Sequence, residues 1–287
     1  MRRPSARLLL AGVAAAVGLT ACEPVRPAPA PDADGAFLLA VGDIASCDES
    51  ADTGTGNLVR LLGGGIAGLG DLAYEDGTLA EFDECFGPPW GHAKHRFYPA
   101  PGNHEYDTPG AAGYFDYFGR LAGRFRRGWY AYDYGSWRVL SLNSEEDIED
   151  QVAFIHEQAA GRPCVLAYWH SPLRSSGSHG GERAVEPLWR AAHRAGVDLV
   201  LNGHDHSYER FGRLGYYGYP NPDGMRQIVV GTGGRHLRPF DEPVRGSEVR
   251  EAGTYGVLQL RLAPGYYRWR FWPANGTFTD RGGDVCR

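Results

Sequence analysis

The stretch VDLVLNGHDHSYER, residues 197–210, joins a short apolar run to a turn that holds two histidines. A run of this length is typical of a buried strand, and strands commonly close with a turn of Gly, Asn or Asp. Here the turn also carries the imidazoles of His204 and His206. Paired histidines beside a glycine are often ordinary surface residues, so their meaning depends on partners supplied elsewhere in the chain.

The same arrangement occurs four times earlier in the chain. In each case a short apolar run ends in a glycine or other small residue, and a side chain capable of binding metal follows it. The runs FLLAVGD, GIAGLGD, FYPAPGNHE and CVLAYWH deliver Asp43, Asp71, Asn103, His104 and His170. Runs that are apolar on both faces predict buried strands. Because ligands at neighbouring strand ends converge on one edge of an α/β sheet, we expect these side chains to meet.

Helix candidates lie between the runs, at residues 54–62, within 148–160 and at 182–195, the last ended by Gly196. Residues 129–144 and 253–274 each alternate about a glycine-containing turn, which predicts two hairpins. The pattern favours an α/β (α+β) fold in which two mixed β-sheets pack together between helices, a four-layer αββα sandwich with a dimetal site at the C-terminal ends of strands. Since neither a repeat nor a second linker is visible, we expect one catalytic domain over residues 36–287.

The N-terminal sequence predicts export. Residues 1–21 have a basic start, an apolar stretch too short to span a bilayer comfortably, and small residues before Cys22, as a signal peptide has. The box LTAC resembles the cleavage site of bacterial lipoproteins, which predicts a cell-envelope protein touching the membrane only through a lipidated Cys22. A plain secretory signal and a secreted protein are the alternative. Residues 22–35 are rich in Pro and Ala, as a tether is.

Charge and cysteine content narrow the choice of function. A formal net charge of −6 gives no broad basic surface, so we expect no specific binding of nucleic acid. Four cysteines follow Cys22, and an even number in an exported chain favours disulfides, with three connectivities open. Cys47 and Cys85 follow two of the acidic loops at short distances, which favours the pair Cys47–Cys85 and leaves Cys164–Cys286 by elimination.

The candidate ligands number seven and comprise two carboxylates, a phenol, an amide and three imidazoles. They are Asp43, Asp71, Tyr74, Asn103, His170, His204 and His206. This set is too large for one tetrahedral zinc ion but suits two six-coordinate ions. A carboxylate such as Asp71 can bridge two ions about 3.5–4 Å apart, the spacing of two-metal phosphoryl-transfer sites.

The motifs occur in a recognisable order: GD at residues 42–43, GD-x-x-Y at 70–74, GNHE at 102–105, His170 at a strand end, and GH-x-H at 203–206. Over residues 37–210 the chain resembles the calcineurin-like metallophosphoesterase superfamily, and Tyr74 makes it similar to the purple acid phosphatase branch. The broader superfamily has a histidine ligand two residues after the first aspartate, where this chain has Ala45. Tyr74 fills that gap, which favours iron.

The resemblance assigns the seven side chains to two metal ions. It places Fe(III) with Asp43, Tyr74 and His206. It places a divalent Fe, Zn or Mn ion with Asn103, His170 and His204, and makes Asp71 the bridge.

The function indicated is an exported dimetal phosphatase that hydrolyses phosphomonoesters, small-molecule substrates, by attack of metal-bound hydroxide. A phosphodiesterase or nucleotidase of the same superfamily is the alternative. A non-catalytic phosphate-binding surface lipoprotein is disfavoured because all seven positions hold coordinating residues. Neither the natural substrate nor the oligomeric state follows from the sequence.

Two further histidines are expected to act on the substrate. Asn103 and His104 are consecutive, so their side chains point in different directions, and His104 should face the phosphoryl group as a catalytic acid. The resemblance implies that His179, nine residues beyond His170, also contacts the substrate. For Arg235 and His236, which follow another strand end, a solvated loop is at least as good an interpretation.

Overall fold

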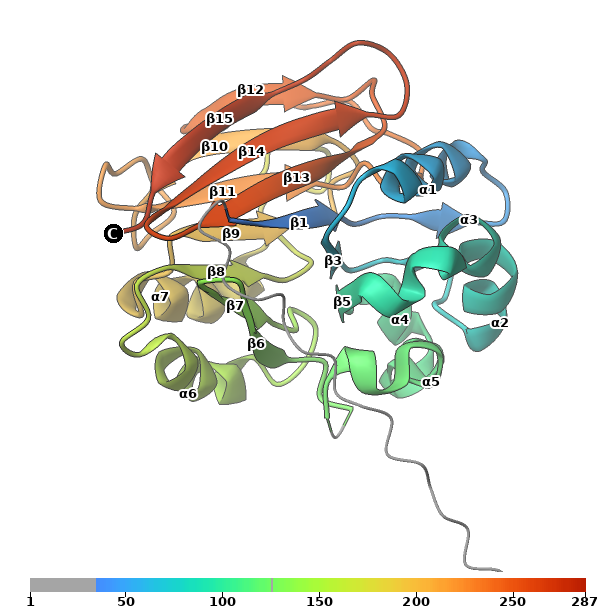
Figure 1. The fold of residues 1–287 in the computed structure, drawn as a ribbon, viewed down its shortest axis with the longest axis horizontal. Helices are drawn as coiled ribbons and strands as arrows, with labels where there is room; N and C mark the ends of the chain where they lie inside the picture. The colour runs from blue at the N-terminus through green and yellow to red at the C-terminus, as the bar shows by residue number, and fades with distance from the viewer. Residues whose placement is uncertain (1–34, 125) are drawn as a thin grey trace, which may run out of the picture.

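The computed structural model describes residues 35–124 and 126–287. These residues form two large mixed sheets packed face to face, with helices on both outer faces (Figure 1). The expected signal peptide, the tether up to residue 34 and Cys22 lie outside the described residues. Within the described part of the chain, no helix is both long and apolar enough to cross a membrane.

The first sheet has six strands, in which β1, β3 and β5 are parallel and β13, β14 and β15 are antiparallel to their neighbours. In spatial order they are β15 (Arg281–Val285), β14 (Tyr266–Pro273), β13 (Gly256–Ala263), β1 (Ala36–Val41), β3 (Gly65–Leu69) and β5 (Phe97–Ala100). The expected second hairpin is β13–β14.

The second sheet has seven strands, and β7, β8, β9 and β11 run parallel in it. In order they are β12 (Ser247–Glu251), β10 (Tyr208–Leu214), β11 (Met225–Val230), β9 (Leu199–Asn202), β8 (Val165–Tyr168), β7 (Trp137–Ser141) and β6 (Tyr130–Tyr134). The first expected hairpin is β6–β7. The short parallel pair β2 (Ala45–Ser46) and β4 (Ala73–Tyr74) lies beside the ends of β1 and β3.

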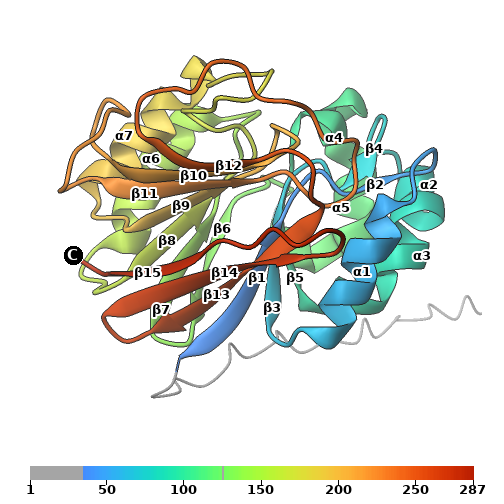
Figure 2. The same cartoon turned by 90° about the horizontal axis from the view of Figure 1, so that it is seen from above.

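The helices are separated into two layers, which the view from above makes plain (Figure 2). The layer on the second sheet consists of α6 (Ile148–Ala159), the 3₁₀ turn η5 (Arg183–Val185) and α7 (Glu186–Arg194). The layer on the first sheet consists of α1 (Ala51–Leu61), α2 (Leu79–Glu81), the π-helix η1 (Phe82–Phe86), α3 (Gly87–Trp90), η2 (Gly91–Arg96), α4 (Asn103–Asp107), η3 (Pro109–Ala111), α5 (Ala112–Phe118) and η4 (Gly119–Ala122). The sequence predicted α1, α6 and α7 but none of the helices over residues 79–122.

Period-two alternation along β1 shows how the layers are joined. Leu38 and Ala40 point into the core between the two sheets, whereas Leu39 and Val41 point outward under the first helical layer. All four are fully buried, as a strand covered on both faces requires. The second helical layer packs on the far sheet through side chains such as Trp189. The four-layer αββα sandwich expected from the sequence is therefore confirmed.

Two disulfides close the fold, and both follow the expected pairing. Cys47–Cys85 joins the loop after β2 to η1 across 38 residues of chain. Cys164–Cys286 spans 122 residues and connects the start of β8 in the second sheet to the end of β15 in the first. The second bridge therefore ties the two sheets together covalently.

Replacing Cys164 and Cys286 together by alanine should lower the free energy of unfolding by about 4–5 kcal/mol, because the unfolded chain gains entropy when this long loop is no longer closed. Replacing Cys47 and Cys85, which close the shorter loop, should lower the free energy of unfolding by about 3–4 kcal/mol. Urea unfolding of both double variants measures the difference. Recovery of Cys286 as a free thiol in a non-reducing peptide map would contradict the assignment.

Candidate metal centre

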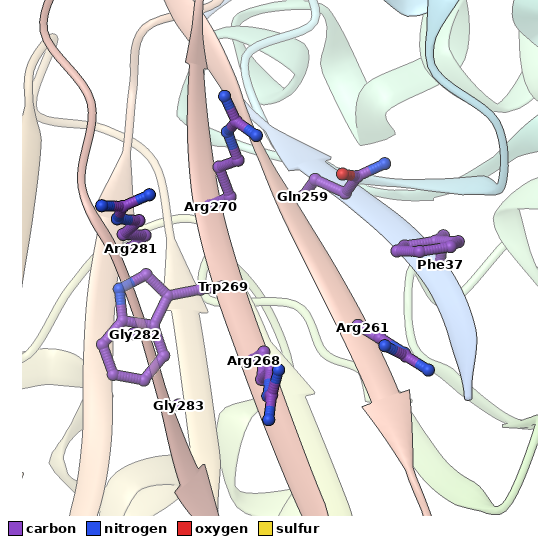
Figure 3. A pocket seen from close by; sticks show the side chains of 9 residues that line it. All are labelled: Phe37, Gln259, Arg261, Arg268, Trp269, Arg270, Arg281, Gly282 and Gly283. Carbon is purple, nitrogen blue, oxygen red and sulfur yellow. The ribbon is translucent and has the colours of Figure 1, made fainter. Parts of the chain in front are cut away.

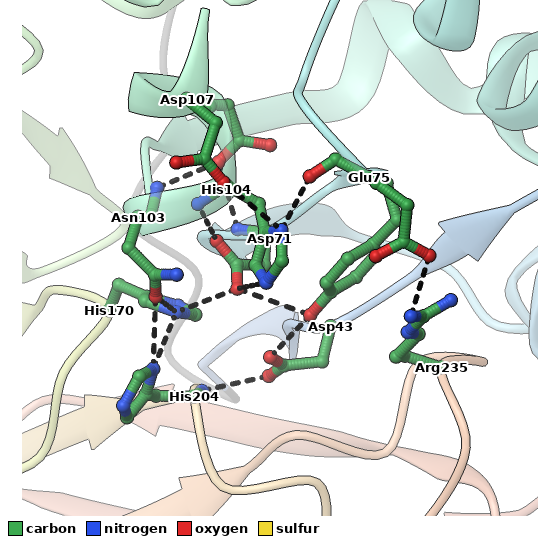
Figure 4. A network of polar contacts seen from close by, with 12 residues as sticks. Asp43, Asp71, Glu75, Asn103, His104, Asp107, His170, His204 and Arg235 are labelled. Atoms are coloured by element: carbon green, nitrogen blue, oxygen red, sulfur yellow. Dashed lines mark hydrogen bonds and ion pairs between the residues drawn. The ribbon is translucent and has the colours of Figure 1, made fainter.

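The carboxyl ends of five parallel strands deliver the candidate ligands to one place. Asp43 follows β1, Asp71 follows β3 and Asn103 follows β5 in the first sheet. His170 and His204 come from the ends of β8 and β9 in the second sheet. Figure 4 shows these side chains pointing toward one another from their separate loops. The structure therefore brings together the strand ends that the sequence singled out.

The first group of donor atoms surrounds the phenol of Tyr74. Its hydroxyl lies 2.9 Å from Oδ1 of Asp43, 3.2 Å from Oδ2 of Asp71 and 3.3 Å from Nε2 of His206. Nε2 of His206 is itself 3.5 Å from Oδ1 of Asp43. Two carboxylate oxygens, a phenol and an imidazole thus share one small volume.

The second group of donor atoms shares a carboxylate oxygen with the first. Oδ1 of Asn103 lies 3.2 Å from Nε2 of His170 and 3.1 Å from Nδ1 of His204, and the two ring nitrogens are 3.2 Å apart. Nε2 of His170 is 3.1 Å from Oδ2 of Asp71, the oxygen that also faces Tyr74. Asp71 therefore stands between the two groups, where a bridging ligand has to stand.

Each aspartate is held by its other oxygen. The backbone N–H of His204 donates to Oδ2 of Asp43 at 2.9 Å, and the N–H of His104 donates to Oδ1 of Asp71 at 2.9 Å. These bonds leave Oδ1 of Asp43 and Oδ2 of Asp71 free to face the donor groups.

The imidazoles are oriented in the same way. Nδ1 of His170 donates to the carbonyl of Leu69 at 2.8 Å, and Nδ1 of His206 donates to the carbonyl of His236 at 2.9 Å. Since a carbonyl oxygen can only accept, Nδ1 of each of these two rings carries a proton and Nε2 faces the cluster.

The backbone adopts unusual conformations to make this convergence possible. Asp43, Asp71 and His204 have positive φ values of 57°, 50° and 72°, each in the left-handed region that costs an ordinary residue about 1–3 kcal/mol. The glycines before two ligands are needed for space, since a Cβ on Gly102 would lie 2.3 Å from Oδ1 of Asp71 and one on Gly203 2.6 Å from Oδ2 of Asp43. The recurring glycine is thus a steric requirement of the site.

A buried glutamate that the sequence did not single out fixes two of the loops. The carboxylate of Glu105 accepts the N–H groups of Asp71 at 2.9 Å, Leu72 at 2.7 Å and Gly102 at 2.7 Å. Its side chain is completely buried, and burial raises its pKa to about 8. Its place in the GNHE motif could have identified it, because it directly follows the predicted ligand Asn103 and the predicted acid His104.

The electrostatics of the site favour positive charge within it. Burial, together with the carboxylates of Asp43 and Asp71, raises the pKa of Tyr74 well above 10. Burial opposes ionisation of Asp71 and His170, but their mutual attraction lowers the pKa of Asp71 below its usual range and raises that of His170 to about 10.

The donor set fits hard or borderline metal cations. Burial lowers the pKa of His204 and of His206 to about 3, so both rings are neutral and carry lone pairs at neutral pH. Neutral imidazoles, carboxylates and an amide oxygen are the ligands that Fe, Zn and Mn ions take in proteins. Among the described residues, a candidate metal group is formed by Asp71, His170 and His204, with ligand atoms within 4.8 Å of one another.

The rim of the centre is cationic. The guanidinium of Arg235 lies 4.8 Å from the centre of the Tyr74 ring and pairs with Glu75 at 2.6 Å, so it does not belong to an ordinary solvated loop. Arg238, which the sequence interpretation passed over, donates to Nε2 of His179 at 2.5 Å. The ring centre of His179 is 4.6 Å from that of His204. The loop after β11 therefore contributes to the site.

Comparison with known proteins decides the family. The sequence pattern of the calcineurin-like phosphoesterases matches residues 28–208, more than half of the chain. The chain belongs to the calcineurin-like phosphoesterase family. Among relatives of this phosphoesterase, a nucleotide pyrophosphatase/phosphodiesterase of Hordeum vulgare is 27% identical over 67% of this chain and 63% of its own. Acid phosphatase type 7 of Mus musculus is 25% identical over 58% of this chain and 46% of its own.

The fold agrees with the family. The structure of a purple acid phosphatase from Lupinus luteus seeds superposes with a TM-score of 0.75 at 20% identity, over 89% of this chain and 55% of that one. This likeness in fold agrees with the similarity in sequence to acid phosphatases, and together they support the resemblance to the purple acid phosphatase branch. This phosphoesterase spans less than two thirds of the length of the two relatives named above.

Replacing Glu105 by alanine should lower the free energy of unfolding by about 2–5 kcal/mol, because three buried N–H groups lose their acceptor. Urea unfolding measures the loss. The exposed Glu84, in η1, provides the control, and Glu84→Ala should change stability by less than about 0.5 kcal/mol. Equal stability of the two variants would show that Glu105 does not hold the loops.

Proposed function

We propose that this chain is an exported, metal-dependent hydrolase of phosphomonoesters. The observation that carries the proposal is the convergence of seven donor side chains into two groups that share Oδ2 of Asp71. A pair of cations bound there would activate water and neutralise the charge that develops on a phosphoryl group. The likeness to acid phosphatases supports the same reaction class.

The two groups of donor atoms suggest how the cations would be divided. Asp43, Tyr74 and His206 would hold Fe(III), because the phenol needs a strongly charged, hard cation beside it to ionise. The second ion, divalent Fe, Zn or Mn, would be held by Asn103, His170 and His204. Asp71 would bridge the two. The three-membered Asp71, His170 and His204 group supports the second site in particular.

His104 is proposed as the group that exchanges a proton with the substrate. Its Nδ1 donates to the carbonyl of Glu75 at 2.5 Å, which leaves Nε2 as the available atom. Nε2 lies 3.9 Å from Oδ2 of Asp71, and the ring lies against that of Tyr74 with centres 4.4 Å apart. His104 thus stands beside the metal centre without entering either donor group, as a general acid for the leaving alkoxide should.

His179 is proposed as a substrate contact that acts together with Arg238. The backbone N–H of His179 donates to Oδ1 of Asp205 at 2.9 Å, which anchors the loop. Burial and the charge of Arg238 lower the pKa of His179, so its ring is neutral beside a permanent cation. The pair would bind a phosphate oxygen: Arg238 would supply the positive charge, and His179 would hold the guanidinium of Arg238 in position.

A phosphodiesterase or nucleotidase is the second candidate, and the similarity to the nucleotide pyrophosphatase/phosphodiesterase of Hordeum vulgare favours it. The test is turnover of 4-nitrophenyl phosphate and bis(4-nitrophenyl) phosphate by the full chain, metal-loaded and chelator-stripped. Metal-dependent turnover that favours the monoester supports the proposal, and preference for the diester selects the second candidate. Absence of turnover of either ester by the metal-loaded chain would leave a non-catalytic phosphate-binding protein.

Export is proposed from the N-terminal sequence and supported by the two disulfides, which persist in oxidising compartments. A lipid anchor at Cys22 is the finer proposal, with secretion as its alternative. Mass spectrometry of the mature N-terminus distinguishes the two, because a lipoprotein would begin with a diacylated Cys22.

Aerobically purified protein should contain iron and absorb visible light through charge transfer from Tyr74. Tyr74→Phe should abolish the visible band and leave the fold intact, because the replaced hydroxyl is the absorbing ligand. Absorption spectra with elemental analysis measure the effect. Tyr106→Phe, which removes a hydroxyl that is bonded to Asn143 and to none of the seven candidate ligands, is the control and should keep the colour. Active protein that contains zinc or manganese and no iron would contradict the assignment.

His104→Ala should keep both metals and the visible band but lose about a hundredfold or more in kcat with an alkyl phosphate, because the leaving alkoxide then lacks its acid. An aryl ester with an activated leaving group should suffer least. His156→Ala, an exposed change in α6, is the control and should leave kcat unchanged. Loss of metal from the His104 variant, or undiminished turnover of the alkyl ester, would rule out the role.

A further inference from the structure

The outer face of the first sheet is only partly covered by helices. Among the residues that the structure describes, part of the outer face of strands β1, β13, β14 and β15 lies beyond the helical layer and contains a shallow cavity of about 560 Å³. Figure 3 shows the arginines Arg261, Arg268, Arg270 and Arg281 projecting from this surface. We call these four residues, with Phe37 and Gln259, the arginine face. None of them belongs to the metal centre.

The strand register places like charges directly opposite one another on this face. Arg261 on β13 pairs with Arg268 on β14, and Arg270 on β14 pairs with Arg281 on β15. Such cross-strand pairs of equal charge are destabilising. The four guanidiniums therefore form an array in two adjacent rows, and an anionic partner would relieve the repulsion between Arg270 and Arg281.

The described acidic side chains do not neutralise three arginines of the array. Among the residues that the structure describes, Arg268, Arg270 and Arg281 form no ion pair. The carboxylates of Asp280, which precedes β15, and of Asp284, which lies within it, form ion pairs with arginines of β10 and β11 in the second sheet. The face is thus locally positive in a chain whose net charge is −6.

The face also carries exposed aromatic surface. Phe37 is 46% exposed and lies opposite Arg261 in the register of β1 and β13. The guanidinium of Arg270 stacks over the ring of Trp272 at 3.5 Å. An aromatic ring beside guanidiniums is suited to the boundary between lipid headgroups and acyl chains.

We propose that the arginine face docks on an anionic lipid bilayer. The array is spread over a sheet rather than enclosed in a cleft, so it matches a surface of phosphate headgroups better than a single small anion. The point at which the preceding 34 residues enter the domain supports the same partner, since Gly35 leads directly into β1 and Phe37. Each arginine near an anionic membrane contributes about 1 kcal/mol, which is about fivefold in affinity.

The test is flotation of the full chain with vesicles of phosphatidylglycerol and phosphatidylcholine, compared with vesicles of phosphatidylcholine alone. The neutral vesicles measure any binding by the N-terminal segment, which is common to all variants. Arg268→Gln, Arg270→Gln and Arg281→Gln combined should reduce partitioning onto the anionic vesicles at least about tenfold and leave partitioning onto neutral vesicles unchanged. Raising the salt from about 0.1 M to about 0.5 M should weaken wild-type binding.

The matched control removes three exposed arginines from another basic surface. Arg120→Gln, Arg124→Gln and Arg127→Gln combined carry the same change of net charge and should reduce vesicle binding by less than about threefold. Thermal unfolding of both triple variants checks that the fold is kept, independently of any enzymatic activity. Equal losses in the two triples, or equal wild-type binding to anionic and neutral vesicles, would overturn the proposal. So would binding of inorganic polyphosphate by the face without binding of vesicles, which would make a soluble polyanion the partner.

Discussion

The carboxylate of Asp71 is the contact on which the whole centre depends. One of its oxygens is fixed by a backbone N–H, and the other faces Tyr74 on one side and His170 on the other. A carboxylate can take this position only if its own loop is rigid. Glu105 supplies that rigidity by accepting N–H groups from the loops after β3 and β5 at once. The strained backbone at Asp71 is therefore sustained by a buried acceptor that bonds directly to its N–H group.

The packing of the two sheets is the second requirement. Asp43, Asp71, Tyr74 and Asn103 come from the first sheet and its adjoining loops, whereas the three imidazoles come from the second. Neither sheet holds a complete set of donors. The apolar core between the sheets and the disulfide that connects them thus maintain the site as well as the fold.

The charged side chains are gathered in separate parts of the domain. The buried centre concentrates carboxylates and imidazoles, and its rim is completed by Arg235 and Arg238 from one loop. The arginine face lies on the outer surface of the first sheet, at the end where the chain enters β1. A domain held through that face would keep the strand ends with the metal centre clear of the surface that it contacts, because Asp43 lies at the opposite end of β1 from Phe37.

Much of this protein could be predicted from the sequence, because local patterns specify what local physics controls. Short runs apolar on both faces determined the central strands, and the glycine followed by a polar residue at their ends determined the ligands. The helices over residues 79–122 were missed, although Phe82, Phe86 and Trp90 recur at every fourth position, because Gly87, Pro88 and Pro89 interrupt the pattern. What only the tertiary structure decided was the function of residues outside the predicted set of ligands. Glu105, Arg235 and Arg238 gain their roles from loops that are distant in sequence, and the arginine face exists because strand register sets four guanidiniums side by side. Which groups meet across a sheet or between loops depends on long-range packing, and that information is absent from any single stretch of chain.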